Sequence, residues 1–186
     1  IYPKTFTEIA QAGTGLKSPL LSGSIYFVTV ILLYLAIGNI PAGIAVTLFF
    51  IHPIVAMLLG WWRDRAAPNR WRWGIMTGVT MGLMLVTPQL QANLSSQFTF
   101  GMMCALGAGI GFGLYAFTAQ NALIQFHPIS FSLITFFLLF LLSSLTSLIL
   151  QITIPQNLWL TLLLWSAGSG LITLGGLVFT NLGIRL

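Results

Sequence analysis

The sequence predicts an all-α fold, a polytopic bundle of transmembrane helices in a lipid bilayer. Hydrophobic residues make up 57% of the chain and charged residues only 5%, whereas a soluble domain carries about 25% charged residues. A bilayer core about 30 Å thick requires roughly 20 apolar residues per helix. The 186 residues contain six runs of about that length, joined by short loops. The mean hydropathy of +0.97 agrees with this interpretation.

Turn and interface residues mark the ends of the expected spans. Asn39, Ile40 and Pro41 form the turn at the end of the first span. The second span ends at Trp61 and Trp62, aromatic residues that favour the headgroup level. Proline punctuates the later connections, as at Pro128. In chain order, the expected spans are 24–40, 42–62, 72–88, 99–121, 128–151 and 157–184.

The positive charge is concentrated where it sets orientation. Four arginines fall in the loop 63–72, with Asp64 as its only acid, and we interpret this loop as cytoplasmic under the positive-inside rule. Residues 1–23, a polar stretch, are expected to form a cytoplasmic loop or lead-in. Six spans place all seven Lys and Arg residues on one side of the plasma (inner) membrane, and a miscount of one span would undo this sorting. The net charge of +5 therefore predicts no nucleic-acid partner.

The sequence lacks the residue patterns of an enzyme. It contains no paired carboxylates, no metal-ligand cluster, no glycine-rich phosphate loop and no nucleophile with an adjacent base. An intramembrane hydrolase requires such groups, so we predict no catalytic residues, no metal and no cofactor. Cys104 lies within the fourth span and is expected to be a small buried residue.

His52 is the most informative polar residue, because it lies near the middle of the second span and directly precedes Pro53. Proline has no N–H, so the carbonyl of Phe49 loses its usual donor and the helix kinks. An ionisable group at this depth indicates a functional site by default, either lining a cavity or coupling transport to protons. The alternative is a neutral imidazole that hydrogen-bonds a neighbouring carbonyl.

Glycines recur at four-residue spacing in two spans, which places them on single helix faces. They are Gly74, Gly78 and Gly82 in the third span, and the pairs Gly107 with Gly111 and Gly109 with Gly113 in the fourth. Such spacing lets helix backbones approach closely, and we favour close packing over a hinge. Because glycine faces also serve oligomers, both a monomer and a homodimer fit the sequence.

A polar stripe marks the sixth span. Ser166, Ser169, Thr173 and Thr180 share one helical face, which indicates either a cavity wall or hydrogen bonding between helices. Tyr115, in the fourth span, shares a side with Gly111 and Thr118.

Three segments resemble the EamA family of the drug/metabolite transporter superfamily. They are IGNIPAGIAVTLFFIHPIVAMLLGWW with the following WRWGIMTGVTMGLMLV, then GMMCALGAGIGFGLYAFTAQNA, and finally LVFTNLGIRL, which is similar to LYLAIGNIPAG at 33–43. The resemblance implies ten helices in two inverted five-helix repeats. This chain would supply helices three to eight, with the first repeat ending in 24–88 and the second beginning in 99–186. The family often has Glu after its fourth helix, where this chain has Asp64.

The resemblance implies transport of small metabolites, such as amino acids, by alternating access around a central cavity, often in the direction of efflux. Family helices three, four, six and eight border that cavity. The implied substrate-cavity candidates are Tyr34, His52, Tyr115, Trp165, Ser166, Ser169 and Thr173.

Two other functions remain open at this point. One is a membrane enzyme of lipid or isoprenoid chemistry whose catalytic residues lie in further termini, since we expect the natural protein to extend beyond Ile1 and Leu186. The other is a structural subunit with no aqueous cavity. The sequence gives neither the substrate, nor the direction of transport, nor the coupling ion.

Overall fold

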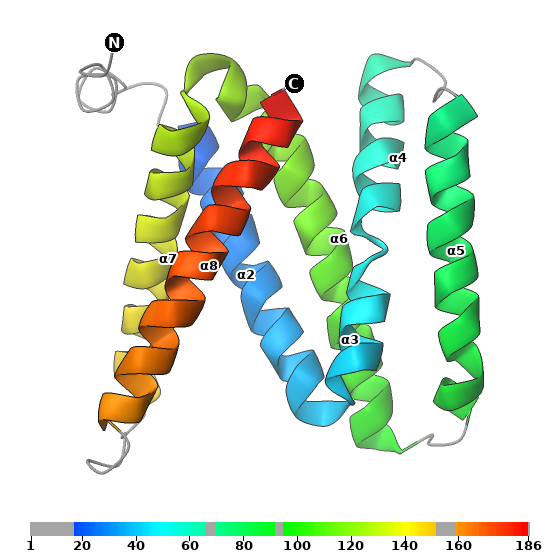
Figure 1. Cartoon of the computed structure of the whole chain (residues 1–186), viewed down its shortest axis with the longest axis horizontal. Coiled ribbons are helices and arrows are strands. Elements are labelled where there is room, and N and C mark those ends of the chain that lie inside the picture. The colour runs from blue at the N-terminus through cyan, green and yellow to red at the C-terminus, as the bar shows by residue number, and fades with distance from the viewer. Residues whose placement is uncertain (1–16, 66–69, 92–94, 152–158, 186) are drawn as a thin grey trace. The chain divides into compact units, whose positions relative to one another are not determined.

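The computed structural model describes residues 17–65, 70–91, 95–151 and 159–185, and these ranges are helical with no strand (Figure 1). The helices are α2 (Lys17–Asn39), α3 (Ala42–Phe49), α4 (His52–Asp64), α5 (Arg70–Gln91), α6 (Ser96–Gln125), α7 (Pro128–Ile149) and α8 (Trp159–Arg185). The predicted all-α fold, a polytopic membrane helical bundle, is confirmed. Residues 1–16 of the expected lead-in lie outside the described ranges.

Within the described ranges, five helical segments are long and apolar enough to cross a membrane. They are Lys17–Asn39, Ala42–Arg63, Ser96–Ile124, Pro128–Ile149 and Trp159–Gly183. The second of these joins α3 and α4 into one apolar length. The remaining expected span corresponds to α5, which has 22 residues but is less apolar, since it begins with Arg70 and ends in the polar sequence before Gln91.

The helices begin and end close to the expected positions, with one notable extension. α2 begins at Lys17 rather than at residue 24, and it includes Pro19 in its first turn. Proline is tolerated there because the first turn of a helix has N–H groups without partners in any case. The polar residues 17–23 therefore belong to a helix and not to a loop.

The chain divides into two compact units, which we describe separately. Unit 1 comprises Ile1–Ser24 and Thr118–Leu186, and unit 2 comprises Ile25–Phe117. In unit 1, α7 and α8 pack against each other. In unit 2, α5 contacts both α3 and α4 and runs alongside them (Figure 1).

Buried polar groups connect the helices of unit 1. The Nδ2 of Asn181, on α8, donates to the Oγ of Ser132, on α7, at 2.8 Å, and both residues are fully buried. Ser22 and Thr118 form a second such pair, with their hydroxyl oxygens 3.1 Å apart. Because lipid offers no competing partner, bonds of this kind hold membrane helices together where apolar burial contributes little.

In unit 2, glycines of α6 allow the junction between α3 and α4 to pack directly on its backbone. A Cβ atom at Gly109 would lie 2.8 Å from the carbonyl oxygen of Phe49, and one at Gly113 would lie 3.0 Å from that of His52. No side chain fits in these gaps. The close-packing interpretation is therefore confirmed for this glycine pair.

The second glycine pair of α6 faces α2. Gly111 lies against Thr29, and a Cβ atom at Gly107 would be 3.4 Å from a methyl group of Leu32. The two overlapping pairs thus serve two different neighbours. By contrast, a Cβ atom at Gly78 of α5 would meet nothing within 4 Å among the described residues, and the same holds for Gly74 and Gly82.

The glycine contacts give a direct stability test. We expect Gly109→Ala to lower the free energy of unfolding by about 1–3 kcal/mol, because the added methyl group would press on a backbone carbonyl that cannot move aside freely. Thermal unfolding of the purified protein in detergent measures the change.

The matched control is Gly78→Ala, which makes the same chemical change on an open helix face. We expect it to leave stability unchanged or raise it slightly, since alanine favours helix more than glycine does. Equal losses from the two variants would contradict the packing described for α6.

Candidate functional site

The second apolar span is interrupted near its middle. α3 ends at Phe49 and α4 begins at His52, and Pro53 lies in the first turn of α4 (Figure 1). The predicted kink at Pro53 is thus an interruption of two residues, Phe50 and Ile51, which form a turn between the two helices. The missing N–H of proline costs nothing at a helix start, which explains why a new helix begins here instead of the old one bending.

His52 compensates for the proline. Its Nδ1 lies 3.2 Å from the carbonyl oxygen of Phe49, the same carbonyl that would accept a hydrogen bond from residue 53 in an unbroken helix. With a proton on Nδ1, the imidazole donates to this carbonyl. The side chain therefore satisfies a backbone acceptor that would cost free energy if left unpaired at this depth, as the alternative interpretation of His52 expected.

Aromatic rings surround the break within unit 2. Phe112 of α6 is central, because its ring lies edge-on to His52 with centroids 4.8 Å apart, and 5.4 Å from the ring of Phe49. On its other side it lies 5.5 Å from Tyr115 and 5.9 Å from Tyr26 of α2. We call these five residues (Tyr26, Phe49, His52, Phe112 and Tyr115) the aromatic cluster.

The aromatic cluster combines ring faces with a few polar groups. It offers ring faces, a tyrosine hydroxyl and an imidazole whose Nε2 can accept a hydrogen bond once Nδ1 carries the proton. Among the described residues, no group of three His, Cys, Asp or Glu side chains could hold a metal ion.

The structure brings two of the predicted cavity residues together. His52 and Tyr115 both contact the ring of Phe112, and Tyr115 is fully buried. Tyr34 belongs to the same unit, but its side chain is 72% exposed on α2 and it is not part of the cluster.

The other candidates lie on α8, in unit 1. Trp165 is 76% exposed, and Ser166, Ser169 and Thr173 are exposed as well. Each of the three hydroxyls donates to a carbonyl of α8 itself, three or four residues back. A hydrogen bond from α8 to α7 comes from Asn181. The role of the stripe as a cavity wall stays a prediction.

Sequence reasoning missed the central ring of the cluster. Phe112 lies between Gly111 and Gly113, and its ring contacts rings of the neighbouring helices. Asn181 was missed too, although an amide within an apolar span is expected to find a partner on another helix.

Comparison with known proteins points to a transporter. Over its full length the chain is 32% identical to an uncharacterized transporter of Synechocystis sp., of whose length it covers 58%. No protein-family model and no solved structure matches the chain. The chain is thus a membrane protein that has a transporter among its relatives. The name of that relative also favours a function other than catalysis.

The contact of His52 with Phe49 gives a second stability test. We expect His52→Leu to lower the free energy of unfolding by about 1–3 kcal/mol, because it leaves the Phe49 carbonyl without a donor. His52→Asn places an amide N–H near the position of Nδ1 and is expected to lose less. The two variants are compared by thermal unfolding, and an equal loss would show that this hydrogen bond contributes nothing.

Proposed function

We propose that this chain forms part of an EamA-type transporter that exports small amphipathic metabolites, such as amino acids, by alternating access. The observation that carries the proposal is the broken second span, packed on the glycines of α6 and surrounded by aromatic rings. Discontinuous helices near the bilayer midplane are where many secondary transporters bind their substrates. The similarity to a protein named as a transporter supports the same function.

The position of the break agrees with a midplane site. α3 has eight residues and α4 has 13, which correspond to about 12 Å and about 20 Å at 1.5 Å per residue. The junction therefore lies well inside a hydrocarbon core of about 30 Å. A backbone interruption at this depth is tolerated only where protein or a water-filled cavity surrounds it.

The local electrostatics favour a zwitterionic substrate. At the break, the C-terminal end of α3 carries partial negative charge and the N-terminal end of α4 carries partial positive charge. An amino acid presents one group of each sign, and its side chain would contact the rings of the aromatic cluster. The tyrosine and imidazole groups supply the few directed hydrogen bonds that such sites use for orientation.

We further propose that the protein lies in the plasma membrane with loop 63–72 on the cytoplasmic side. The support is the concentration of arginine in that loop and the positive-inside rule. The lipid bilayer and the transported molecule are then the partners of the chain. Two inverted five-helix repeats, of which this chain would carry helices three to eight, complete the proposed architecture.

Transport by the full-length protein tests the proposal. In proteoliposomes loaded with a panel of amino acids, we expect export of at least one of them above the level of protein-free vesicles. Phe112→Leu is expected to reduce that rate about tenfold, because aromatic contacts contribute about 0.5–1.5 kcal/mol each and Phe112 makes several. Export of no amino acid would contradict the proposed substrate class.

The matched control is Phe137→Leu, which makes the same exchange on an exposed face of α7. Its transport rate is expected to equal that of the unaltered protein. Both variants are first shown by thermal unfolding to be folded at the assay temperature, so that a loss of transport reports on the site and not on folding. Equal losses would place the substrate elsewhere.

The pH dependence of transport separates two roles of His52. If His52 only donates a hydrogen bond to the Phe49 carbonyl, the variant His52→Asn keeps both the transport rate and its pH profile. The variant His52→Gln then has a lower transport rate, because its amide lies farther from the backbone. If His52 carries the coupled proton, both variants lose the pH dependence between about pH 5 and 8, where imidazole changes its charge. We expect the first outcome, because Nδ1 already bonds to Phe49.

A further inference from the structure

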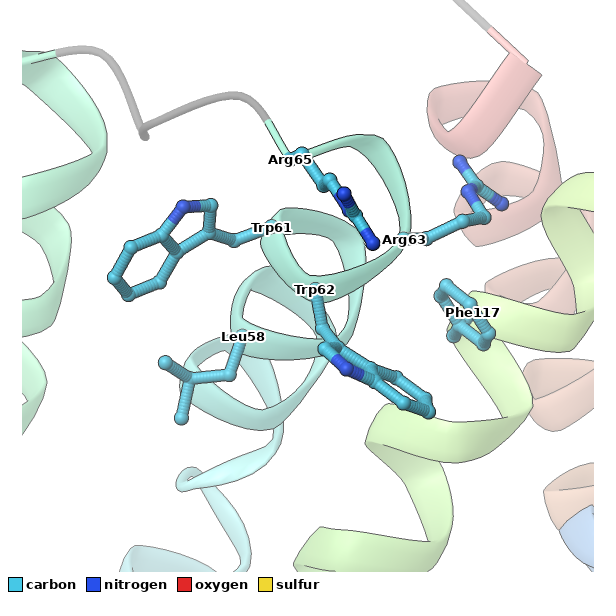
Figure 2. A pocket seen from close by; sticks show the side chains of 6 residues that line it. All are labelled: Leu58, Trp61, Trp62, Arg63, Arg65 and Phe117. Carbon is cyan, nitrogen blue, oxygen red and sulfur yellow. The ribbon is translucent and has the colours of Figure 1, made fainter.

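An open hollow of about 780 Å³ lies on unit 2 at the C-terminal end of α4 (Figure 2). Its lining consists of Leu58, Trp61, Trp62, Arg63 and Arg65 from α4 and its cap, with Phe117 from α6. The sequence indicated only that the arginine loop sets orientation. The structure adds that two of its arginines share a concave surface with three aromatic rings.

The face of α4 explains four of these residues. Three of them follow Leu58 after three, four and seven positions, namely Trp61, Trp62 and Arg65. All four residues therefore share one side of the helix. The helix ends at Arg65, which has a φ of 50° and donates its N–H to the carbonyl of Trp61 at 2.9 Å. This left-handed cap turns the chain, and Figure 2 shows the Arg65 side chain directed back over the last turn of α4.

Arg63 closes the hollow toward α6. Its Cζ lies 5.0 Å from the centroid of the Phe117 ring, a cation–π arrangement that fixes the direction of the guanidinium. The guanidiniums of Arg63 and Arg65 therefore border the same hollow (Figure 2). The helix cap positions Arg65, and the ring of Phe117 positions Arg63.

The lining changes from charged to apolar along the helix. Arg65 lies at the end of the span, Trp61 and Trp62 lie one turn inward, and Leu58 lies about 10 Å deeper than Arg65 at 1.5 Å per residue. The side chain of Trp62 is 81% exposed and that of Leu58 45%, so the hollow is open along its length. A phospholipid has the same order: phosphate, glycerol region, acyl chain.

We propose that this hollow binds an anionic phospholipid of the surrounding bilayer. The forked guanidiniums of Arg63 and Arg65 match the geometry of a phosphate group. Trp61 and Trp62 lie at the level of the glycerol backbone, where tryptophan is favoured, and Leu58 contacts the upper acyl chain. A free phosphate ion would satisfy the guanidiniums alone, but it would leave the apolar half of the hollow unused.

Tryptophan fluorescence reports occupancy directly. In the full-length protein, the tryptophans outside the hollow are replaced by phenylalanine, and the protein is placed in phosphatidylcholine vesicles. Brominated phosphatidylglycerol or brominated phosphatidylcholine is then added as a minor component, since bromine quenches a nearby indole. The ratio of the two quenching efficiencies gives the preference for the anionic lipid.

We expect phosphatidylglycerol to quench Trp61 and Trp62 preferentially. Arg63→Gln with Arg65→Gln should reduce the preference about tenfold or more, since hydrogen bonds to charged groups are lost. The matched control is Arg70→Gln with Arg72→Gln, which removes the same charge from the start of α5. It should reduce the preference by no more than about twofold, because an attraction without direct contact to the phosphate is screened by salt.

Three results would overturn the proposal. Equal losses from the two pairs of variants would mean a general attraction of the loop to anionic membranes. Release of the quenching by inorganic phosphate in the buffer would assign the hollow to a free phosphate ion. Equal quenching by both lipids in the unaltered protein would show that no anionic phospholipid binds there.

Discussion

The hydrocarbon surroundings impose one constraint on which the candidate site depends: every backbone polar group must find a partner within the protein. Pro53 removes one donor from the second span, and the carbonyl of Phe49 would be the group left without it. The imidazole of His52 lies 3.2 Å from that carbonyl. The interruption of the span thus depends on three neighbouring groups: Pro53, the imidazole of His52 and the carbonyl of Phe49.

The break also determines the packing of unit 2. α6 presents Gly109 and Gly113 where the junction between α3 and α4 approaches it closely. The same helix uses Gly111 against Thr29 of α2. Phe112, directed from between these glycines, occupies the space that remains and contacts rings from both neighbours. On α6, glycines therefore allow contact with neighbouring backbone, and Phe112 fills the volume beside them.

Much of the fold follows from the sequence, because apolar length and flanking polarity are local properties. The expected spans correspond to α2, the joined α3 and α4, and α5 to α8, and the effect of Pro53 was predicted from the missing N–H. The identity of the helix faces that meet is a different matter. Gly78 and Gly109 have the same spacing pattern in the sequence, yet only Gly109 has a close neighbour among the described residues. Which of them packs depends on tertiary contacts that periodicity does not contain.

The same reasoning applies to the polar residues. The hydroxyl stripe of α8 drew attention because it repeats, whereas Asn181 stands alone and provides the bond to Ser132. A serine or threonine can satisfy its hydroxyl within its own helix, as Thr173 does with Ser169. An asparagine side chain has more groups to satisfy than its own helix offers. The number of hydrogen-bonding groups on a side chain therefore predicted contacts between helices better than the repeat of polar residues did.

The limited apolarity of α5 has a consequence for biogenesis. It is a 22-residue helix that does not reach the apolar character of the other five spans, and it contacts α3 and α4. A segment of marginal hydrophobicity partitions into the bilayer more readily when a companion is already inserted. During synthesis, the preceding apolar span would therefore enter first and draw α5 in as the second arm of a hairpin.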